Sequence, residues 1–523
     1  MSTLEQQQIE GYALSPQQKR LFRDFVPGSP VPRNRCSVSI KGSLDPNRLR
    51  ASLEALQERH EILRTGYEMI AGLSDPVQTI AATGRIIFDT ADLESLVSAE
   101  RELRIEQAWD EIAGHSATRT AEGTPEPLRA QLLKLDSEHH LLLFSLSILH
   151  SDGPTLPRLA AELSEIYAAG GEAGEVDEEA LQYVQFAEWQ NELLESEDSE
   201  TALEFWRQRK LAERKPKPLP FQHAGNSAQR QMQIWIETLP SDLSSRLDAL
   251  AEATELAPGT VLLTAWATLL GRLLGEEDLV LGLLVDGRKY EEVDAMPGPL
   301  AQALPVRAEL APSSSFSEAL ARLAQEAEEA IEWQEGWAGA RGSSTPWRFG
   351  FEALDAVLQS KTEGGLSWHL ERLDSQLERF DLELAARRLA TGWTCDFRFD
   401  AASLAEASVR HLASAFLTVL AAALEAPESR LADLPILSEA TREALIYDWS
   451  QAETRTDETH IGEIDTDETY TASTFTTAVH RQFENQAQST PDATAVETSD
   501  AQGQVQRLSY RDLDTSANRL ARS

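Results

Sequence analysis

Apolar residues recur along the first part of this chain at two spacings, one typical of helices and one typical of buried strands. Residues 45–60 place three leucines on one helical face, directly after the start signal Asp45-Pro46. Residues 138–149 form a short apolar run that follows charged residues and ends in Ser-Asp-Gly-Pro. That run predicts a buried strand. Leucines at helical spacing resume from Leu156, so a second helix is predicted after the turn.

Helical and strand patterns follow one another again in the second part of the chain. Residues 259–275 are apolar over most of their length and predict a buried helix. The apolar run 279–285 follows, predicts a strand and ends in a turn at Asp286-Gly287. Because helical and strand patterns alternate throughout, the chain is predicted to be a mixed α/β protein.

Two segments have the composition of connections. Residues 169–180 are rich in glycine and acidic residues and predict a loop. Residues 451–472 are polar and acidic with few apolar anchors, so they cannot bury a core and predict a linker. Residues 473–523 regain helical and strand patterns but are too few for a domain of ordinary size. We therefore expect them to be one piece of a further domain.

The composition restricts the partners and compartments to be considered. The chain has 523 residues with 47 basic and 86 acidic side chains, and its net charge of −39 repels nucleic acid and anionic membranes. No run approaches the roughly 20 apolar residues that span a bilayer, and the start of the chain does not resemble a secretory signal. Cys36 and Cys395 lie far apart, which favours a reducing, cytoplasmic location over a disulfide framework or a zinc site.

Several short motifs occur along the chain in a fixed order. They are Leu14–Phe22, Arg59–Thr65, Tyr183–Gln190, Gly282–Arg288, Gly298–Pro305, Phe380–Leu382, Asp396–Asp400 and Leu434–Ser438. Together they resemble, over about residues 11–450, the motifs of the condensation domain of nonribosomal peptide synthetases. The match at Arg59–Thr65, which reads Arg-His-Glu-Ile-Leu-Arg-Thr, is nearly complete. One such motif is weak evidence, whereas many motifs in the family's order are specific to it.

The resemblance implies an α/β fold of two chloramphenicol-acetyltransferase-like lobes in a V, residues 1–190 and 191–450. It also implies a tunnel between the lobes that admits the phosphopantetheine arms of carrier protein domains, with no cofactor bound directly. Residues 508–513 and 518–521 look like the opening of an adenylation domain, so 473–523 is expected to be its truncated start. The chain is then the front of a larger synthetase.

The family's catalytic signature, His-His-x-x-x-Asp-Gly, is only half present. Asp152-Gly153 supplies its end, and counting back places Ser147 and Ile148 at the two histidine positions. In the family the second histidine is thought to orient or deprotonate the acceptor amine, a role that suits a neutral imidazole. Ile148 has no proton acceptor. The resemblance further implies a structural ion pair between Asp152 and Arg64 of the second motif, with Gly153 in the motif loop.

Other histidines are possible replacements. His139-His140 is a true pair but precedes the strand, about 26 Å from its far end at roughly 3.3 Å per residue, and is expected to be structural. His150 lies two residues beyond the second histidine position. If the strand continued, His150 would share the face of that position and point into the tunnel, so it is the one remaining candidate for proton transfer. If the chain turns there, His150 is structural.

Three functions are compatible with these residues. The first is a degenerate condensation domain that does not form peptide bonds and serves as a structural or recruitment module for carrier-bound aminoacyl substrates. In that role it would adjoin an adenylation domain and recruit a tailoring enzyme. The second is acyl transfer by positioning alone or with His150. The third is a coenzyme A-dependent acyltransferase of the same fold, which the adenylation-like tail disfavours.

Overall fold

The computed structural model divides into two compact units, Met1–Ser450 and Gln451–Ser523. The residues that it describes are 11–24, 31–114, 125, 128–171, 181–211, 217–223, 231–340, 347–355, 361–376, 378, 380–389, 392–443, 483, 486–499 and 505–520. The predicted linker 451–472 and most of the predicted loop 169–180 lie outside these residues.

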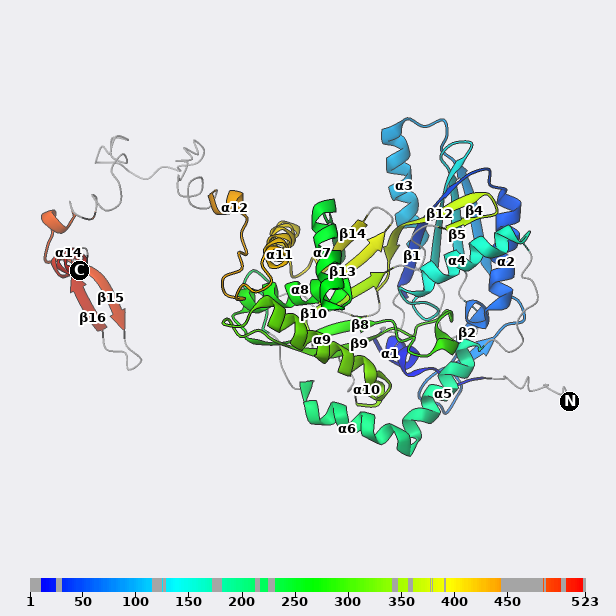
Figure 1. Cartoon of the computed structure of the whole chain (residues 1–523), viewed down its shortest axis with the longest axis horizontal. Helices are drawn as coiled ribbons and strands as arrows, with labels where there is room; N and C mark the ends of the chain where they lie inside the picture. The colour runs from blue at the N-terminus through cyan, green and yellow to red at the C-terminus, as the bar shows by residue number, and fades with distance from the viewer. Residues whose placement is uncertain are drawn as a thin grey trace, which may run out of the picture. The chain divides into compact units, whose positions relative to one another are not determined.

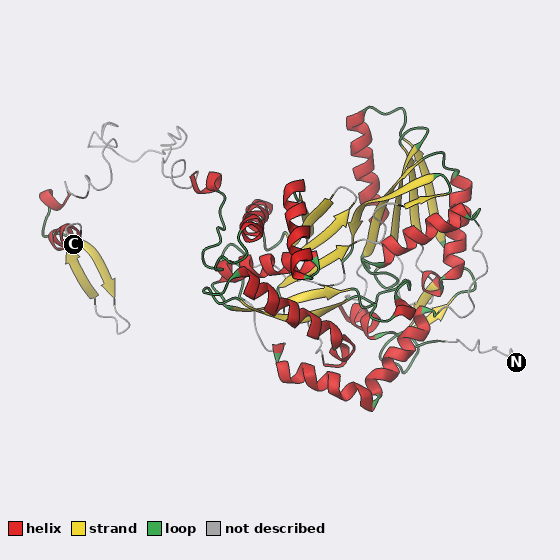
Figure 2. Cartoon of the chain, in the orientation of Figure 1, coloured by secondary structure: helices red, strands yellow, loops and turns green. Residues whose placement is uncertain are grey.

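The first unit contains two six-stranded sheets (Figure 2). The first sheet has the order β11-β12-β1-β6-β5-β4. Its strands are β1 (Arg33–Lys41), β4 (Ile86–Asp92), β5 (Leu128–Lys134), β6 (His139–Ser147), β11 (Lys361–Glu363) and β12 (Leu366–Asp374). Strands β4 and β5 are parallel and the other neighbours are antiparallel. Although β11 and β12 come late in the sequence, they extend the sheet that the early strands form.

Helices cover both faces of the first sheet because successive strand residues face opposite sides (Figure 1). On one face α2 (Pro46–Arg59) and α4 (Thr155–Ala168) pack on the even-numbered residues of β6, and on the other α3 (Ser98–Ala113) packs on Leu141 and Leu143. Asp45 caps α2 by accepting a hydrogen bond from Asn47 N, and Pro46 is at its first turn. The predicted helix 45–60 and strand 138–149 are thus confirmed.

The second sheet has the order β7-β14-β13-β10-β8-β9. Its strands are β7 (Met232–Thr238), β8 (Asp278–Val285), β9 (Gln302–Glu309), β10 (Phe349–Asp355), β13 (Leu382–Leu389) and β14 (Gly392–Asp400). Its apolar face shares one core with α7 (Ser241–Thr254), α8 (Pro258–Leu274), α9 (Phe316–Glu332) and α11 (Glu406–Glu425). Helix α8 and strand β8 confirm the predictions for 259–275 and 279–285.

The opposite face of the second sheet carries charged side chains that are nevertheless buried. Glu352 lies on β10, Glu383 and Arg387 on β13, and Asp396 and Arg398 on β14. Their neighbours in the sequence, such as Phe351, Leu384, Phe397 and Phe399, face the helices instead. Alternation along each strand therefore separates an apolar core from a polar wall.

Helix α11 is the one described helix that is long and apolar enough to cross a bilayer by length and composition. Seven of its residues, from Val409 to Ala423, are buried within the second core. The apolar character of α11 is accounted for by this packing, since core helices of large domains share it.

The remaining elements are shorter or lie at the edges of the two sheets. They are α1 (Pro16–Asp24), β2 (Thr65–Glu68), β3 (Val77–Ile80), α5 (Tyr183–Glu195), α6 (Glu200–Arg209), α10 (Gln334–Ala340) and α12 (Glu439–Glu443). The second unit contains the hairpin β15 (Thr494–Ser499) and β16 (Val505–Ser509), followed by α14 (Tyr510–Leu520). Helix and strand patterns predicted after residue 473 are present there.

Candidate functional site

The turn that follows β6 holds the positions of the half-present catalytic motif. Strand β6 ends at Ser147, whose carbonyl accepts hydrogen bonds from His150 N at 2.9 Å and Ser151 Oγ at 3.0 Å. Ile148 N donates to the carbonyl of Pro32 at 3.2 Å. Because these bonds close a tight turn, the strand's alternation of faces does not extend beyond Ser147.

The side chain of Ile148 is packed in a small apolar cluster and is 3% exposed. The cluster also contains Leu21, Val31, Tyr67 and Leu149. An aliphatic side chain in such surroundings neither accepts nor donates a proton. The position that carries the second histidine in the family motif is therefore part of the core here.

His150 is buried beside the same cluster and is 1% exposed. Its ring stacks on Tyr67 with the centroids 5.5 Å apart and the planes 15° from parallel. Burial, and then the positive charge of Arg33, lower the pKa of His150 to about 3, against a small opposing effect of the Thr65 backbone. The imidazole is thus neutral and a weak base at neutral pH.

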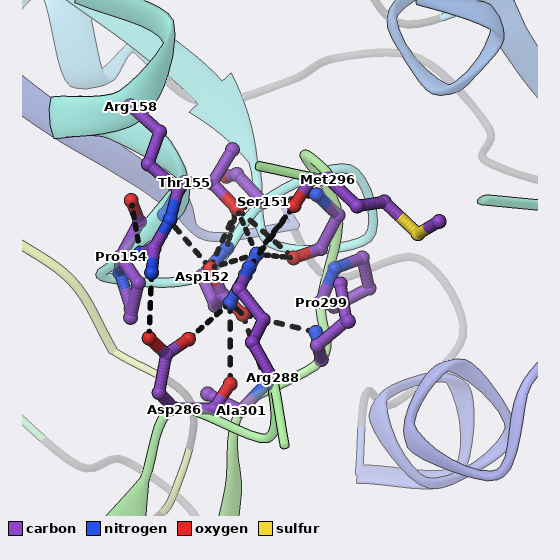
Figure 3. Close-up of polar contacts among 12 residues, drawn as sticks. Ser151, Asp152, Pro154, Thr155, Arg158, Asp286, Arg288, Met296, Pro299 and Ala301 are labelled. Atoms are coloured by element: carbon purple, nitrogen blue, oxygen red, sulfur yellow. Dashed lines mark hydrogen bonds and ion pairs between the residues drawn. The ribbon is translucent and has the colours of Figure 1, made fainter. Parts of the chain in front are cut away.

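Asp152 is fully buried and joins the β6–α4 turn to the segment that follows β8 (Figure 3). Its two oxygens accept hydrogen bonds from Arg288 Nη1 at 2.9 Å and Nη2 at 3.2 Å. Oδ2 also accepts from the backbone N–H groups of Leu300 at 2.9 Å and Ala301 at 2.8 Å. Oδ1 accepts from the backbone N–H of Thr155 at 2.9 Å. This carboxylate is therefore the hub of a buried network.

The predicted ion pair between Arg64 and Asp152 is absent, and this prediction was wrong. Arg64 Nη1 donates to the carbonyl of Ala81 at 2.7 Å, and Nη2 lies 3.3 Å from Glu61 Oε1. Arg288 occupies the place that was assigned to Arg64. The available signal was Arg288 itself, which ends one of the family-like motifs, because a buried carboxylate requires a buried cation.

Arg288 has no exposed side-chain surface and every part of its guanidinium is hydrogen-bonded. It donates to Asp286 and to the carbonyls of Met296 and Gly298 as well as to Asp152. Burial lowers the pKa of Arg288, but the carboxylates of Asp152 and Asp286 outweigh burial and hold it above its ordinary value. The pair is thus a permanently charged structural contact.

Gly153 is positioned against the second sheet, where a larger residue does not fit. A Cβ atom there would lie 2.8 Å from Ser375 Oγ and 3.1 Å from Glu352 Oε1. Contacts this short force neighbouring atoms to move. Asp152 thus holds the turn to the segment that follows β8 through its ion pair with Arg288, and the small size of Gly153 lets the turn pack closely against Ser375 and Glu352.

A cavity of about 1120 Å³ lies between the two sheets. It is lined from the first sheet by β1 and β12, with α3 beside them, and from the second by β7, β13 and β14. Among the residues that the structure describes, its lining includes Val31, Pro32 and Arg33 but not Ser147, Ile148 or His150. The cavity therefore approaches the β6–α4 turn without being lined by its side chains.

The other residues singled out in the sequence have structural environments. His139 and His140 are the first two residues of β6 and do not precede the strand, and His139 Nε2 lies 2.9 Å from Ser39 Oγ. Within the described ranges no group of three or more potential ligands for a metal ion occurs.

Comparison with known proteins identifies the family. A family model described as "Condensation domain" matches residues 8–336. Bacitracin synthase 3 of Bacillus licheniformis is 25% identical over 100% of this chain and 8% of that protein. Chondramide synthase cmdD of Chondromyces crocatus is 27% identical over 97% of this chain and 13% of its own length. The chain thus spans a small fraction of these relatives.

Solved structures share the fold at low sequence identity. SgcC5 from Streptomyces globisporus has a TM-score of 0.68 at 22% identity and covers 80% of this chain and 99% of its own. The first condensation domain of the calcium-dependent antibiotic synthetase has a TM-score of 0.71 at 18% identity, covering 82% and 99%. The X-domain from teicoplanin biosynthesis, solved with OxyB, has 0.65 at 22%, covering 82% and 97%. The predicted two-lobed α/β fold is thereby confirmed.

Proposed function

This chain belongs to the condensation domain family, and we propose that it is a degenerate member that does not form peptide bonds itself. It acts within a nonribosomal peptide synthetase as a structural or recruitment module for aminoacyl groups held on carrier proteins. The single observation that carries the proposal is Ile148, an aliphatic side chain packed in a core cluster where the family motif has its second histidine.

The alternative, acyl transfer with His150 as the base, is disfavoured by the surroundings of this residue. A base must come within about 3 Å of the amine that it deprotonates. His150 is enclosed between Tyr67 and the β6–α4 turn and does not line the described cavity. A pKa of about 3 also leaves its proton affinity far below that of an amine.

Retention of the scaffold supports a role that still needs the fold. Asp152 and Arg288 form a completely hydrogen-bonded network although the histidines are missing. A buried pair of this kind is costly to keep unless every group is satisfied, as it is here. The cavity also exceeds the roughly 300–1,000 Å³ of ordinary ligand pockets. It leaves room for an extended phosphopantetheine arm, which a carrier protein would present.

Two partners follow from the proposal. The first is an adenylation domain whose start would be residues 473–523, supported by relatives that align over 97–100% of the chain and so continue past the condensation-like part. The second is a tailoring enzyme, supported by the structural neighbour that was solved together with OxyB. In both cases the module would position a carrier-bound aminoacyl group for a reaction carried out elsewhere.

A reconstituted assay tests the lack of condensation. The chain is mixed with one carrier protein loaded with a donor aminoacyl group and one loaded with an acceptor, and amide product is followed by mass spectrometry. A relative that has both motif histidines is the positive control, and His150→Ala is assayed in parallel. For the unchanged chain and for His150→Ala, we expect product to form only at the rate of the enzyme-free mixture.

Product formed at a rate comparable to the positive control would refute the proposal. If that activity disappeared in His150→Ala, the alternative with His150 as the base would replace it. If it persisted, positioning alone would account for catalysis. Co-purification of the full chain with a soluble oxygenase or hydroxylase would support the recruitment role.

A further inference from the structure

The two six-stranded sheets repeat one arrangement of four strands. In the first sheet β1, β6, β5 and β4 lie side by side, with β4 and β5 parallel and the other neighbours antiparallel. In the second sheet β7, β14, β13 and β10 have the same order and the same relative directions. Strand β7 therefore occupies in the second sheet the position that β1 occupies in the first.

The outer edges of β1 and β7 differ. The edge of β1 is covered by β12, which pairs with it antiparallel. Among the residues that the structure describes, no strand covers the equivalent edge of β7, and the hydrogen bonds outside helices and sheet ladders include none of its backbone groups. Its residues Ile234 and Ile236 are 37% and 49% exposed. An uncovered edge strand of this kind carries N–H and C=O groups that can pair with another chain.

The sequence of β7 is complementary to itself. When two copies of the strand pair antiparallel, all seven residues align if Trp235 lies opposite Trp235 of the second copy. Apolar side chains then lie opposite each other at the centre, and the strand's one charged residue lies opposite an amide. Such pairs are favourable, whereas like charges directly opposite each other are not. The pairs are Ile234 with Ile236, Met232 with Thr238, and Gln233 with Glu237.

Strand β4, the outer strand of the first sheet, lacks this complementarity. It also has seven residues, and full antiparallel alignment of two copies would place Asp89 opposite Asp89. Two carboxylates in direct opposition repel each other. Charged residues on an edge strand are one way in which proteins prevent pairing with other chains. Of these two outer strands, β7 is therefore the one whose sequence favours a second copy.

We propose that β7 pairs antiparallel with β7 of a second copy of this chain, about a two-fold axis at Trp235. The second sheets of the two copies join into one continuous sheet. Ile234 and Ile236 also line the cavity, so the cavities of the two copies open on the same face of the joined sheet. An edge of seven residues is small beside the roughly 20–30 residues a side of a standard interface, so the dimer is weak, with a Kd in the micromolar range.

Analytical ultracentrifugation of the full chain at concentrations from about 1 to 200 μM tests dimer formation. Gln233→Glu places a second carboxylate opposite Glu237 of the other copy, and the two-fold axis repeats this contact. Gln233→Lys places an ammonium group there instead. Thr90→Glu is the matched control, because Thr90 is an exposed residue of the outer strand β4 and gains the same charge.

We expect a monomer–dimer equilibrium that shifts toward the dimer as the concentration rises. Gln233→Glu should raise the Kd about tenfold because like charges oppose each other twice, and Gln233→Lys should lower it about threefold. Thr90→Glu should change the Kd less than about twofold, since β4 takes no part in the contact. An unchanged melting temperature for each variant shows that a weakened dimer is caused by the interface and not by unfolding.

Disulfide formation tests the register of the two strands. Cys36 and Cys395 are fully buried, so a cysteine introduced on β7 is the one that reacts. Met232 of one copy lies opposite Thr238 of the other, whereas the two copies of either residue are about 20 Å apart at roughly 3.3 Å per residue. A mixture of Met232→Cys and Thr238→Cys proteins should therefore form a disulfide-linked dimer under mild oxidation, and neither variant alone should do so.

A single monomeric species at every concentration would overturn the proposal. A dimer that Gln233→Glu and Thr90→Glu weaken equally would also overturn it, because the contact would then not involve β7. Disulfide-linked dimers that form from one variant alone as readily as from the mixture would exclude the proposed register. None of these outcomes depends on whether the chain forms peptide bonds.

Discussion

The network around Asp152 gives the sharpest test of how this chain is held together. Asp152→Ala would remove the buried carboxylate of the Arg288 pair and leave the guanidinium with Asp286 alone, and breaking a buried pair costs about 3–5 kcal/mol. It would also leave the backbone N–H groups of Thr155 and Ala301 without an acceptor, whereas Leu300 N would keep its hydrogen bond to the Gly298 carbonyl. Because such terms are not additive, we expect a loss of at least about 4 kcal/mol in the free energy of unfolding.

Arg64→Ala is the matched control, because the sequence motifs assign the pairing role to Arg64 and the structure assigns it to Arg288. Arg64 donates one hydrogen bond to the Ala81 carbonyl and forms a partly exposed contact with Glu61. Its removal should cost about 1 kcal/mol. Asp152→Asn, which keeps the shape and one acceptor oxygen, should lie between the two variants.

Urea-induced unfolding followed by tryptophan fluorescence measures these differences. The double variant Asp152→Ala/Arg288→Met should be less destabilised than the sum of the single variants, since removing both charges leaves neither unpaired. A loss below about 1 kcal/mol for Asp152→Ala would refute the role of the network. Equal losses of unfolding free energy for Arg64→Ala and Asp152→Ala would instead support the Arg64–Asp152 pair that the motifs imply.

Further predictions concern pH and close packing. The pKa of His150 falls from 6.5 to about 3 on folding, so the free energy of unfolding decreases as pH falls below 6.5. Between pH 7.5 and 5.5, His150→Leu should therefore lose about 1.4 kcal/mol less of this free energy than the wild type. The control His411→Gln changes an exposed histidine and should show the same loss as the wild type. Burial raises the pKa of Glu383 from 4.5 to about 7, so this group contributes stability at low pH that is lost as pH rises from 4.5 to 7. Glu383→Gln should flatten that decline by at most about 3 kcal/mol, and an unchanged slope in urea titrations would contradict the burial of the carboxyl. Gly153→Ala should lower the free energy of unfolding by about 1–3 kcal/mol because its Cβ would lie 2.8 Å from Ser375 Oγ. Adding Ser375→Ala to the same chain should recover part of this loss. An unchanged melting temperature for Gly153→Ala would exclude the close contact.

The local elements were predictable because hydrophobic spacing reports burial. Leucines three and four residues apart predicted α2, and the apolar run entered from charge predicted β6. These signals depend on which side of an element faces the core, and they need no knowledge of distant residues. The spacing of apolar residues did not indicate that β11 and β12 pair with strands of the first sheet, because strand pairing depends on the tertiary fold.

The charged contacts show the limit of motifs. The family resemblance implied that an arginine would pair with Asp152, and the structure shows that this carboxylate is buried against a cation. The choice between Arg64 and Arg288 depended on which backbone segment reaches the turn, and residues 286–301 reach it.

The amino-acid sequence by itself determined the family, the alternation of helices and strands, and the presence of an aliphatic residue at position 148, where no fold can create a proton acceptor. Only the tertiary structure decided the fate of His150. Hydrogen bonds to the Ser147 carbonyl turn the backbone after β6 and direct this side chain onto Tyr67. Periodicity predicts the face of a residue only while the strand continues, and here the strand ends at Ser147, before His150 is reached.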